Sequence, residues 1–387
     1  MSTATPFVAN GRLDTTEVAG AFEHALRDRA GGNAVRACTT WAQVEEAARD
    51  AGARHLAVQA AAERSLTLTW MGALSGAGIL CEKLLVELDQ LEHGEQADEQ
   101  LTPPPLDEER MHRWAGAWFS VAGLHRLRAE QLRRSGDYAG ALEELDEASR
   151  APDQRPNAAL PQWGRVILSE ALRLAGDFDG AYEVAAAALA RADEEEAHPW
   201  VVAIADRALA RALLALDELD EAVARFRAMA REPIHRNADS AVACDLGIGE
   251  ALRRSGARAT AGHHLGRARA LAREHGHTVG WIHAQLCLAE LARDRREDPG
   301  EVAELVAQVH RELLLSEHPW LRLRAFAIGA LSANGARAER LIGRAEDELL
   351  RFHRRSCDLE LERDLVERCR FAVTAGVPAE PIELDFL

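Results

Sequence analysis

The phrase Arg134-Ser135-Gly136-Asp137-Tyr138-Ala139-Gly140-Ala141 recurs 40 residues later as Leu174-Ala175-Gly176-Asp177-Phe178-Asp179-Gly180-Ala181. Each copy lies between two runs rich in Ala, Leu, Arg and Glu, most of which are strong helix formers. In each copy a glycine is suited to end one helix with a positive φ, and the aspartate after it is suited to cap the next helix. The two phrases therefore predict the turns of two helical hairpins.

The same spacing continues along the chain and predicts further hairpins. Turn residues align at Gly136, Gly176, Asp217, Gly256, a weaker position near Arg295, and Gly335. Ahead of the first four turns, a small residue is followed three positions later by leucine, which makes a close-packing ridge on the helix. We expect Gly136, Gly176 and Gly256 to be helix C-terminal residues with positive φ.

A second marker, His-Pro-Trp, occurs at residues 198–200 and again at residues 318–320, three periods later. Proline is favoured at a helix start because its missing N–H is not needed there. We expect Trp163, Trp200 and Trp320 to lie near the starts of first helices and to pack against the preceding hairpin. The alternative for Trp163 is a platform for a ligand.

These markers resemble those of the tetratricopeptide repeat (TPR) family over roughly residues 115 to 350. The matching features are the small and large residues before each turn, the Gly-Asp-aromatic turn, the alanine after it, Phe226 and Pro233. Two features depart from the family: the period is near 40 rather than about 34, and its Trp-x-x-Leu-Gly-x-x-Tyr run is absent. The resemblance implies an all-α, right-handed solenoid of stacked helical hairpins with a helical N-terminal cap. It also implies a concave face lined by first helices, and protein or peptide binding rather than catalysis.

The predicted domain organisation has three parts. Residues 1–100 form either a helical cap or degenerate repeats, residues 108–376 form the repeat solenoid, and residues 377–387 form a tail. The boundary is expected at Gly94 to Asp107, because this segment includes three consecutive prolines, which do not continue a helix.

Outside the clear repeats, local signals predict further elements. Residues 1–13 are expected to be a loose tail. Helix starts are indicated by capping residues and helix ends by glycines or polar turns. The expected helices are Asp14 to Arg29, Thr40 to Gly52, Arg54 to Leu74, Ile79 to His93 and, at the other end, Glu346 to Thr374.

Composition limits the classes of function. The formal net charge of -17 disfavours general nucleic-acid binding, because phosphate backbones would be repelled. The six cysteines form no Cys-x-x-Cys pair and are expected to be reduced and mostly buried, as in a cytoplasmic protein. The longest uncharged stretch, Ser65 to Cys81, is expected to be a buried core helix rather than a membrane anchor. We therefore expect a cytoplasmic, bacterial-type protein with no membrane or nucleic-acid partner.

No catalytic constellation is present in the sequence. Nucleotide-binding loops, Gly-x-Ser-x-Gly and His-Glu-x-x-His are all missing, so we predict no enzyme activity and no cofactor. Two pairs, His283 with Cys287 and His353 with Cys357, have the spacing of one helical turn. Because a metal site needs three or four converging ligands, these pairs leave metal binding open but do not predict it.

One row of the first helices is the predicted ligand surface. We expect it to bind an acidic peptide segment, because guanidinium groups bind carboxylates in a bidentate manner. The alternative is that its arginines pair with Glu130, Glu170 and Glu250 along and between helices. The row consists of Arg126, Glu130, Arg133, Trp163, Glu170, Arg173, Arg207, Arg211, Glu250 and Arg253.

The predicted function is a non-catalytic scaffold or sensor module that binds a protein or peptide on its concave face. The alternative is an accessory subunit of a separately encoded enzyme or regulatory system, such as a protease, an NTPase, or a biosynthetic or defence assembly. Homo-oligomerisation is left open by the sequence.

Overall fold

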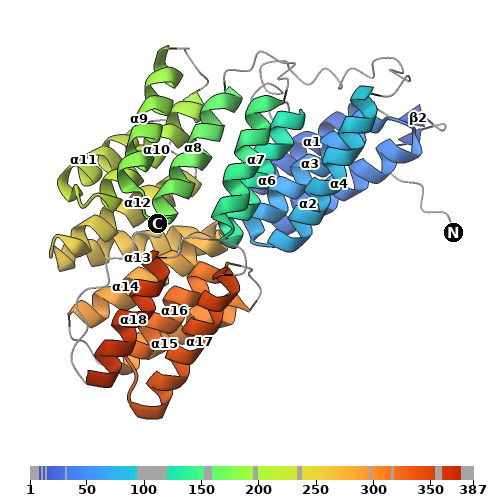
Figure 1. Ribbon diagram of the computed structural model, residues 1–387. Coiled ribbons are helices and arrows are strands. Elements are labelled where there is room, and N and C mark those ends of the chain that lie inside the picture. Colours follow the sequence, from blue (N-terminus) through green and yellow to red (C-terminus); the bar gives the residue numbers. More distant parts are fainter. Residues whose placement is uncertain are drawn as a thin grey trace. The chain divides into compact units, whose positions relative to one another are not determined.

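The chain folds into helices that follow one another as hairpins in the computed structural model (Figure 1). The structure describes residues 8–9, 12–13, 15–30, 33–93, 120–151, 159–194, 199–232, 238–295, 299–314, 318–353 and 360–375. Contacts between Cα atoms divide the chain into two units. The first comprises Met1–Gln131 and Glu143–Leu160, and the second comprises Leu132–Leu142 and Pro161–Leu387. The predicted boundary at 94–107 and the predicted tail lie outside the described residues.

In the first unit, α1 contacts α2, α2 contacts α3 and α3 contacts α4. Its aromatic core pairs Phe22 with Trp41, whose ring centroids lie 4.7 Å apart. Gln131 donates a hydrogen bond of 3.0 Å to Ser65, which itself donates to the backbone oxygen of Ala77. These bonds attach the first predicted hairpin to the N-terminal helices. The described helices are α1 Thr15–Ala30, α2 Ala34–Asp50, α3 Arg54–Met71 and α4 Leu74–His93, followed by α6 Val121–Ser135 and α7 Tyr138–Arg150, which continue into the second unit.

Several predicted element bounds in this unit were wrong. Thr40 does not start a helix but lies inside α2, and its hydroxyl donates to the backbone oxygen of Arg36. The stretch from Ser65 to Cys81 is not one helix, because Gly72 adopts φ 82° and separates α3 from α4. In the predicted N-terminal tail, β1 Val8–Ala9 pairs antiparallel with β2 Arg12–Leu13. In each case a local hydrogen bond or turn determines the observed element bounds, and the residue pattern used for the prediction does not.

Among the described residues, the second unit continues the repeats with five hairpins and one further helix. Within it, α10 contacts α12, α12 contacts α14 and α14 contacts α16, so the first helices of consecutive hairpins pack directly on one another. The single C-terminal helix predicted from Glu346 to Thr374 is divided between α17 and α18. The hairpins are α8 Ala159–Leu174 with α9 Phe178–Glu194, α10 Pro199–Ala215 with α11 Leu219–Met229, α12 Ala238–Arg254 with α13 Arg258–Glu274, α14 Thr278–Asp294 with α15 Pro299–Leu313, and α16 Pro319–Leu331 with α17 Gly335–His353, followed by α18 Glu360–Ala375.

The turn chemistry predicted from the sequence is confirmed. Gly136, Gly176 and Gly256 follow first helices with φ values of 84°, 90° and 83°. Asp137 and Asp177 each accept a hydrogen bond of 2.9 Å from the backbone N–H three residues later. Asp217 adopts φ 63° at the aligned position without being glycine, and α14 ends in a turn at Arg295. At the last aligned position, Gly335 is the first residue of α17 and has φ 53°. The 40-residue register therefore holds across the described hairpins.

Buried aromatic residues and thiols complete the core. Trp163 and Trp320 are buried near the starts of α8 and α16, and the Trp320 ring lies 4.8 Å from the ring of His283 in the preceding hairpin. Trp200 also lies at a helix start, but its side chain is outside the described residues. Burial raises the pKa of Cys81, Cys287 and Cys369 to about 12. Among the described helices, none combines the length and apolar character that a membrane span requires.

Candidate functional site

A Glu-x-x-Arg motif marks the C-terminal half of four first helices. The glutamates are buried and the motif recurs every 40 residues. In α10 the aligned position, six residues before the turn, holds Arg211 instead of glutamate, and Leu214 replaces the arginine. The four motifs are Glu130 with Arg133, Glu170 with Arg173, Glu250 with Arg253, and Glu290 with Arg293.

Four buried charged residues and the partly buried Asp294 join α12, α14 and α16. We call these five residues the α12–α16 network: Glu250, Arg253, Glu290, Asp294 and Arg324. Arg253 donates to both oxygens of Glu250, at 2.9 and 2.7 Å. It also donates to Asp294 of the next first helix at 2.7 Å, and lies 3.8 Å from Glu290. Arg324 in turn donates to both oxygens of Glu290, at 3.1 and 2.6 Å. Each guanidinium therefore crosses to a neighbouring hairpin.

The pKa values in this network follow from the competition between burial and pairing. Burial would raise the pKa of Glu250, but Arg253, which also donates hydrogen bonds, and Arg324 lower it to about 2. Burial would lower the pKa of Arg324, but Glu290, Cys287 and Glu250 raise it above its ordinary value. Glu250, Arg253 and Arg324 therefore stay charged near neutral pH. The network as a whole holds two guanidiniums and three carboxylates.

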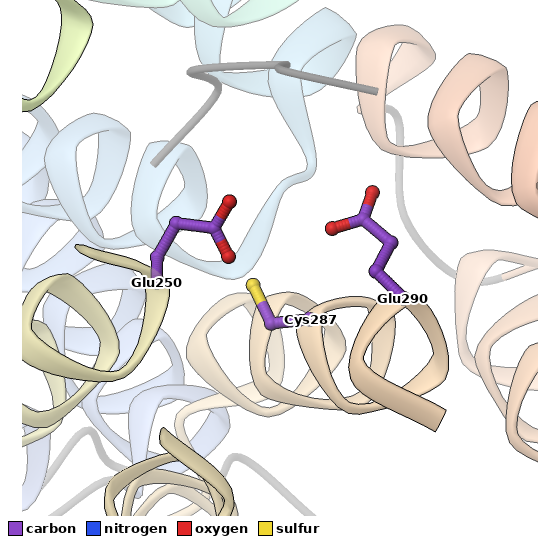
Figure 2. A group of neighbouring side chains, drawn as sticks. All are labelled: Glu250, Cys287 and Glu290. Carbon is purple, nitrogen blue, oxygen red and sulfur yellow. The ribbon is translucent and has the colours of Figure 1, made fainter. Parts of the chain in front are cut away.

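Glu250, Cys287 and Glu290 have the geometry of a possible metal-ligand group (Figure 2). One ligand atom from each lies within 4.8 Å of the others, and all three residues are buried. However, both carboxylates already accept two hydrogen bonds from arginine, and burial raises the pKa of the Cys287 thiol to about 12. A cation at this place would have to displace both guanidiniums, so these residues fit ion pairing better than metal binding.

The His283 and Cys287 pair singled out in the sequence does not act as one unit. Cys287 accepts from Arg324 at 3.6 Å, whereas His283 packs against Trp320. Burial lowers the pKa of His283 well below its ordinary value, and Arg324 and Arg211 lower it further. The second pair, His353 and Cys357, lies outside the described side chains.

A second group of charges, which we call the α8–α10 cluster, surrounds one carboxylate: Glu170 with Arg133, Arg173, Arg207 and Arg211. Arg173 and Arg211 contact Glu170 at 3.0 and 3.3 Å. Burial would raise the pKa of Glu170, but Arg173, Arg211 and Arg133 lower it far below its ordinary value. Three of the four guanidiniums therefore act on Glu170, and Arg207 acts on Arg211.

The excess positive charge acts on Arg211. Burial lowers its pKa, Glu170 opposes this, and Arg207, Arg173 and Arg133 lower it further, to about 10. Asp206 is adjacent to Arg207 in the chain, but it pairs with Arg225 of α11. The Arg211 side chain is 26% exposed, whereas that of Arg253 is 1% exposed. Arg211 is therefore a charged group that a ligand can reach.

The structure brings together some of the predicted site residues. Glu170, Arg173, Arg207, Arg211 and Arg133 act on one another, and Glu250 pairs with Arg253. These are the pairings between arginine and glutamate that the sequence offered as the alternative. Arg126 and Glu130 are buried in the first unit, and Trp163 is buried in the second.

Sequence reasoning missed three members of the α12–α16 network. Glu290 carries a clear signal, because it continues the Glu-x-x-Arg motif at the 40-residue spacing. Asp294 and Arg324 have no counterpart in the other repeats that would have indicated their roles. Their partners are 41 and 34 residues away in the chain and are identified only by the packing of neighbouring helices.

The fold can be compared with known proteins. No protein-family model and no curated protein matches the chain. Among solved structures, it is similar to a Rap protein complexed with competence and sporulation factor. The identity is 12%, over 93% of this chain and 97% of that chain, and the TM-score is 0.57. The fold is that of a TPR-like helical solenoid. The TPR domain of P58(IPK) also matches, with 14% identity over 93% of this chain and 99% of that domain, but the TM-score of 0.24 supports no argument.

Proposed function

We propose that this TPR-like solenoid is a non-catalytic binding module whose first helices hold an acidic segment of a protein or peptide. The observation that carries the proposal is the α8–α10 cluster, in which Arg173 and Arg211 contact Glu170, Arg133 also lowers its pKa, and Arg211 is partly exposed. A carboxylate of a ligand would match this excess charge with charge-assisted hydrogen bonds. Within the second unit, the proposed surface consists of the partly exposed arginines of the predicted row, Arg133, Arg207 and Arg211.

Two further observations support binding rather than catalysis. The Rap protein of similar fold was solved in complex with competence and sporulation factor, so a solenoid of this kind accommodates a partner. The shifted carboxylates Glu170 and Glu250 are held by arginines, whereas a catalytic acid or base has a pKa near the working pH. We infer a scaffold or sensor acting in a bacterial-type cytoplasm.

The test is binding to an array of synthetic peptides that vary in the number of Glu and Asp residues. The variant carries Arg133→Gln, Arg173→Gln and Arg211→Gln. The matched control carries Arg191→Gln, Arg227→Gln and Arg231→Gln, which removes three exposed arginines from the region of α9 and α11. Circular dichroism verifies that both variants remain folded.

We expect the unmodified chain and the control to prefer acidic peptides, and the variant to lose at least about tenfold in affinity, because each lost charge pair weakens the complex. A folded variant that binds acidic peptides as tightly as the unmodified chain would contradict the proposal.

A further inference from the structure

The Glu-x-x-Arg motif has one reversal of charge, and it lies within the α8–α10 cluster. Position by position, Arg211 of α10 takes the place that Glu170, Glu250 and Glu290 occupy in α8, α12 and α14. The glutamates at these places are at most 5% exposed, and Arg211 is more exposed than any of them. The replacement therefore changes both the sign of the charge and its access to solvent.

At the next step along the array, from α12 to α14, the position aligned with Arg211 carries a carboxylate. Arg253 of α12 reaches forward to α14, where it contacts Asp294 at 2.7 Å and lies 3.8 Å from Glu290. At the step from α8 to α10, the residues aligned with Glu290 and Asp294 are Arg211 and Ala215. At this step α10 therefore has neither of the carboxylates that α14 offers to Arg253. Arg211, a cation, takes the place of the first, and Ala215 takes the place of the second.

Arg207 increases the imbalance. It precedes Arg211 by one helical turn, so the two side chains lie on the same face of α10. Its charge lowers the pKa of Arg211, as do the charges of Arg173 and Arg133. The arginines of α6, α8 and α10 therefore act on one another at α10. At the aligned positions of α14, the chain has two acids, Glu290 and Asp294.

We propose that Arg211 and Arg207 form a subsite for one carboxylate of the ligand, which supplies the charge that Glu290 and Asp294 supply at the next step. This inference rests on the proposed binding function and narrows it to one helix. A guanidinium binds a carboxylate through two parallel hydrogen bonds, and two guanidiniums one turn apart can share its oxygens. Arg253 and Arg324 are 1% exposed and already paired, so a ligand does not reach them. Recognition is therefore assigned to α10.

The carboxylate can come from an acidic side chain or from the free end of a peptide. Three hexapeptide probes, each labelled at the N-terminus, distinguish these sources. Hexaglutamate with an amidated C-terminus has only side-chain carboxylates, hexaglutamine with a free C-terminus has only the terminal carboxylate, and amidated hexaglutamine has neither. Binding is measured by fluorescence anisotropy at about 0.15 M salt, which screens the overall negative charge beyond about 8 Å.

The decisive variant is Arg211→Glu, which restores the residue found in the other repeats. Arg191→Glu makes the same change of charge on the exposed face of α9 and is the matched control. Arg207→Gln is a second variant that removes one cation without adding an acid. The melting temperature of each variant is measured with the binding.

We expect a carboxylate-bearing probe to bind the unmodified chain and the Arg191→Glu variant, and amidated hexaglutamine not to bind. Arg211→Glu should weaken that binding at least tenfold and Arg207→Gln should weaken it less. The melting temperature of Arg211→Glu should equal or exceed that of the unmodified chain, because the new carboxylate pairs with the surrounding cations.

Three results would overturn the subsite, and they have different meanings. If a carboxylate probe binds Arg211→Glu and Arg207→Gln as tightly as the unmodified chain, the subsite is wrong while the proposed function stands. If no carboxylate probe binds the unmodified chain, both the subsite and an acidic ligand are wrong. A melting temperature for Arg211→Glu well below that of Arg191→Glu would show that Arg211 is a structural partner of Glu170.

Discussion

The α12–α16 network and the α8–α10 cluster are built on the same repeated motif but differ in charge balance. In the network, two guanidiniums meet three carboxylates: Arg253 contacts acids of α12 and α14, and Arg324 of α16 contacts Glu290 of α14. In the cluster, Arg173 and Arg211 contact Glu170, Arg133 also lowers its pKa, and Arg211 stands where other first helices carry the glutamate. We infer that the repeated motif stabilises the fold at one step and serves binding at another through a change of one residue.

Burial explains why the two regions should respond differently to mutation. Removing one partner of a fully buried ion pair leaves an uncompensated charge in a medium that solvates it poorly. Removing one of several like charges at a partly exposed position relieves repulsion and costs little. The predictions below separate these two cases.

The largest effect is expected for Arg324→Met. This change leaves the buried carboxylate of Glu290 without the two hydrogen bonds that Arg324 donates. We expect the free energy of unfolding to fall by about 3–5 kcal/mol, as for other broken buried pairs. Urea denaturation followed by circular dichroism measures it. A loss below about 1 kcal/mol would show that the network does not stabilise the fold.

The pH dependence of stability tests the charges near α16. Burial lowers the pKa of His318 from 6.5 to about 3, and Arg134 and Arg133 contribute. The unfolded chain therefore takes up a proton below pH 6.5 that the folded chain does not, so stability falls as the pH falls from 6.5 towards 3. Each such histidine contributes a slope of about 1.4 kcal/mol per pH unit.

The variant His318→Gln should reduce this slope between pH 6.5 and 5, where Glu170 and Glu250 remain ionised because arginines lower their pKa values. Urea denaturation at several pH values gives the slope. An unchanged slope would mean that His318 is protonated in the folded protein or accessible to solvent.

Substitutions of the turn glycines should lower stability by similar amounts in the two regions. Gly176 follows α8 and Gly256 follows α12, with φ values of 90° and 83°. Valine at either position is strained by the left-handed backbone, so Gly176→Val and Gly256→Val should each cost about 1–3 kcal/mol. Thermal denaturation should place the two variants close together. A large difference would show that the surrounding charges, rather than the turns alone, decide local stability.

The smallest effect is expected for Arg211→Gln. The side chain contacts Glu170 at 3.3 Å but is surrounded by Arg133, Arg173 and Arg207 and is partly exposed. We expect the free energy of unfolding to change by less than about 1 kcal/mol. A loss comparable with that of Arg324→Met would make the two regions equivalent in stability and remove the contrast between them.

The sequence by itself determined the repeats of this protein. The Gly-Asp turns, their spacing and the position of Glu170 six residues before Gly176 follow from interactions within a few residues of the chain, which the order of residues encodes directly. The same local reasoning failed at Thr40 and Gly72, where a side chain within a helix and a turn without the repeated phrase gave misleading signals.

Only the tertiary structure decided how the charges pair. Arg324 meets Glu290, and Arg253 meets Asp294, because neighbouring first helices pack with particular offsets and rotamers. The sequence places acids and bases on the same face but does not specify which carboxylate each long side chain reaches. That choice fixes which arginines are buried in pairs and leaves Arg211 of α10 among like charges and partly exposed.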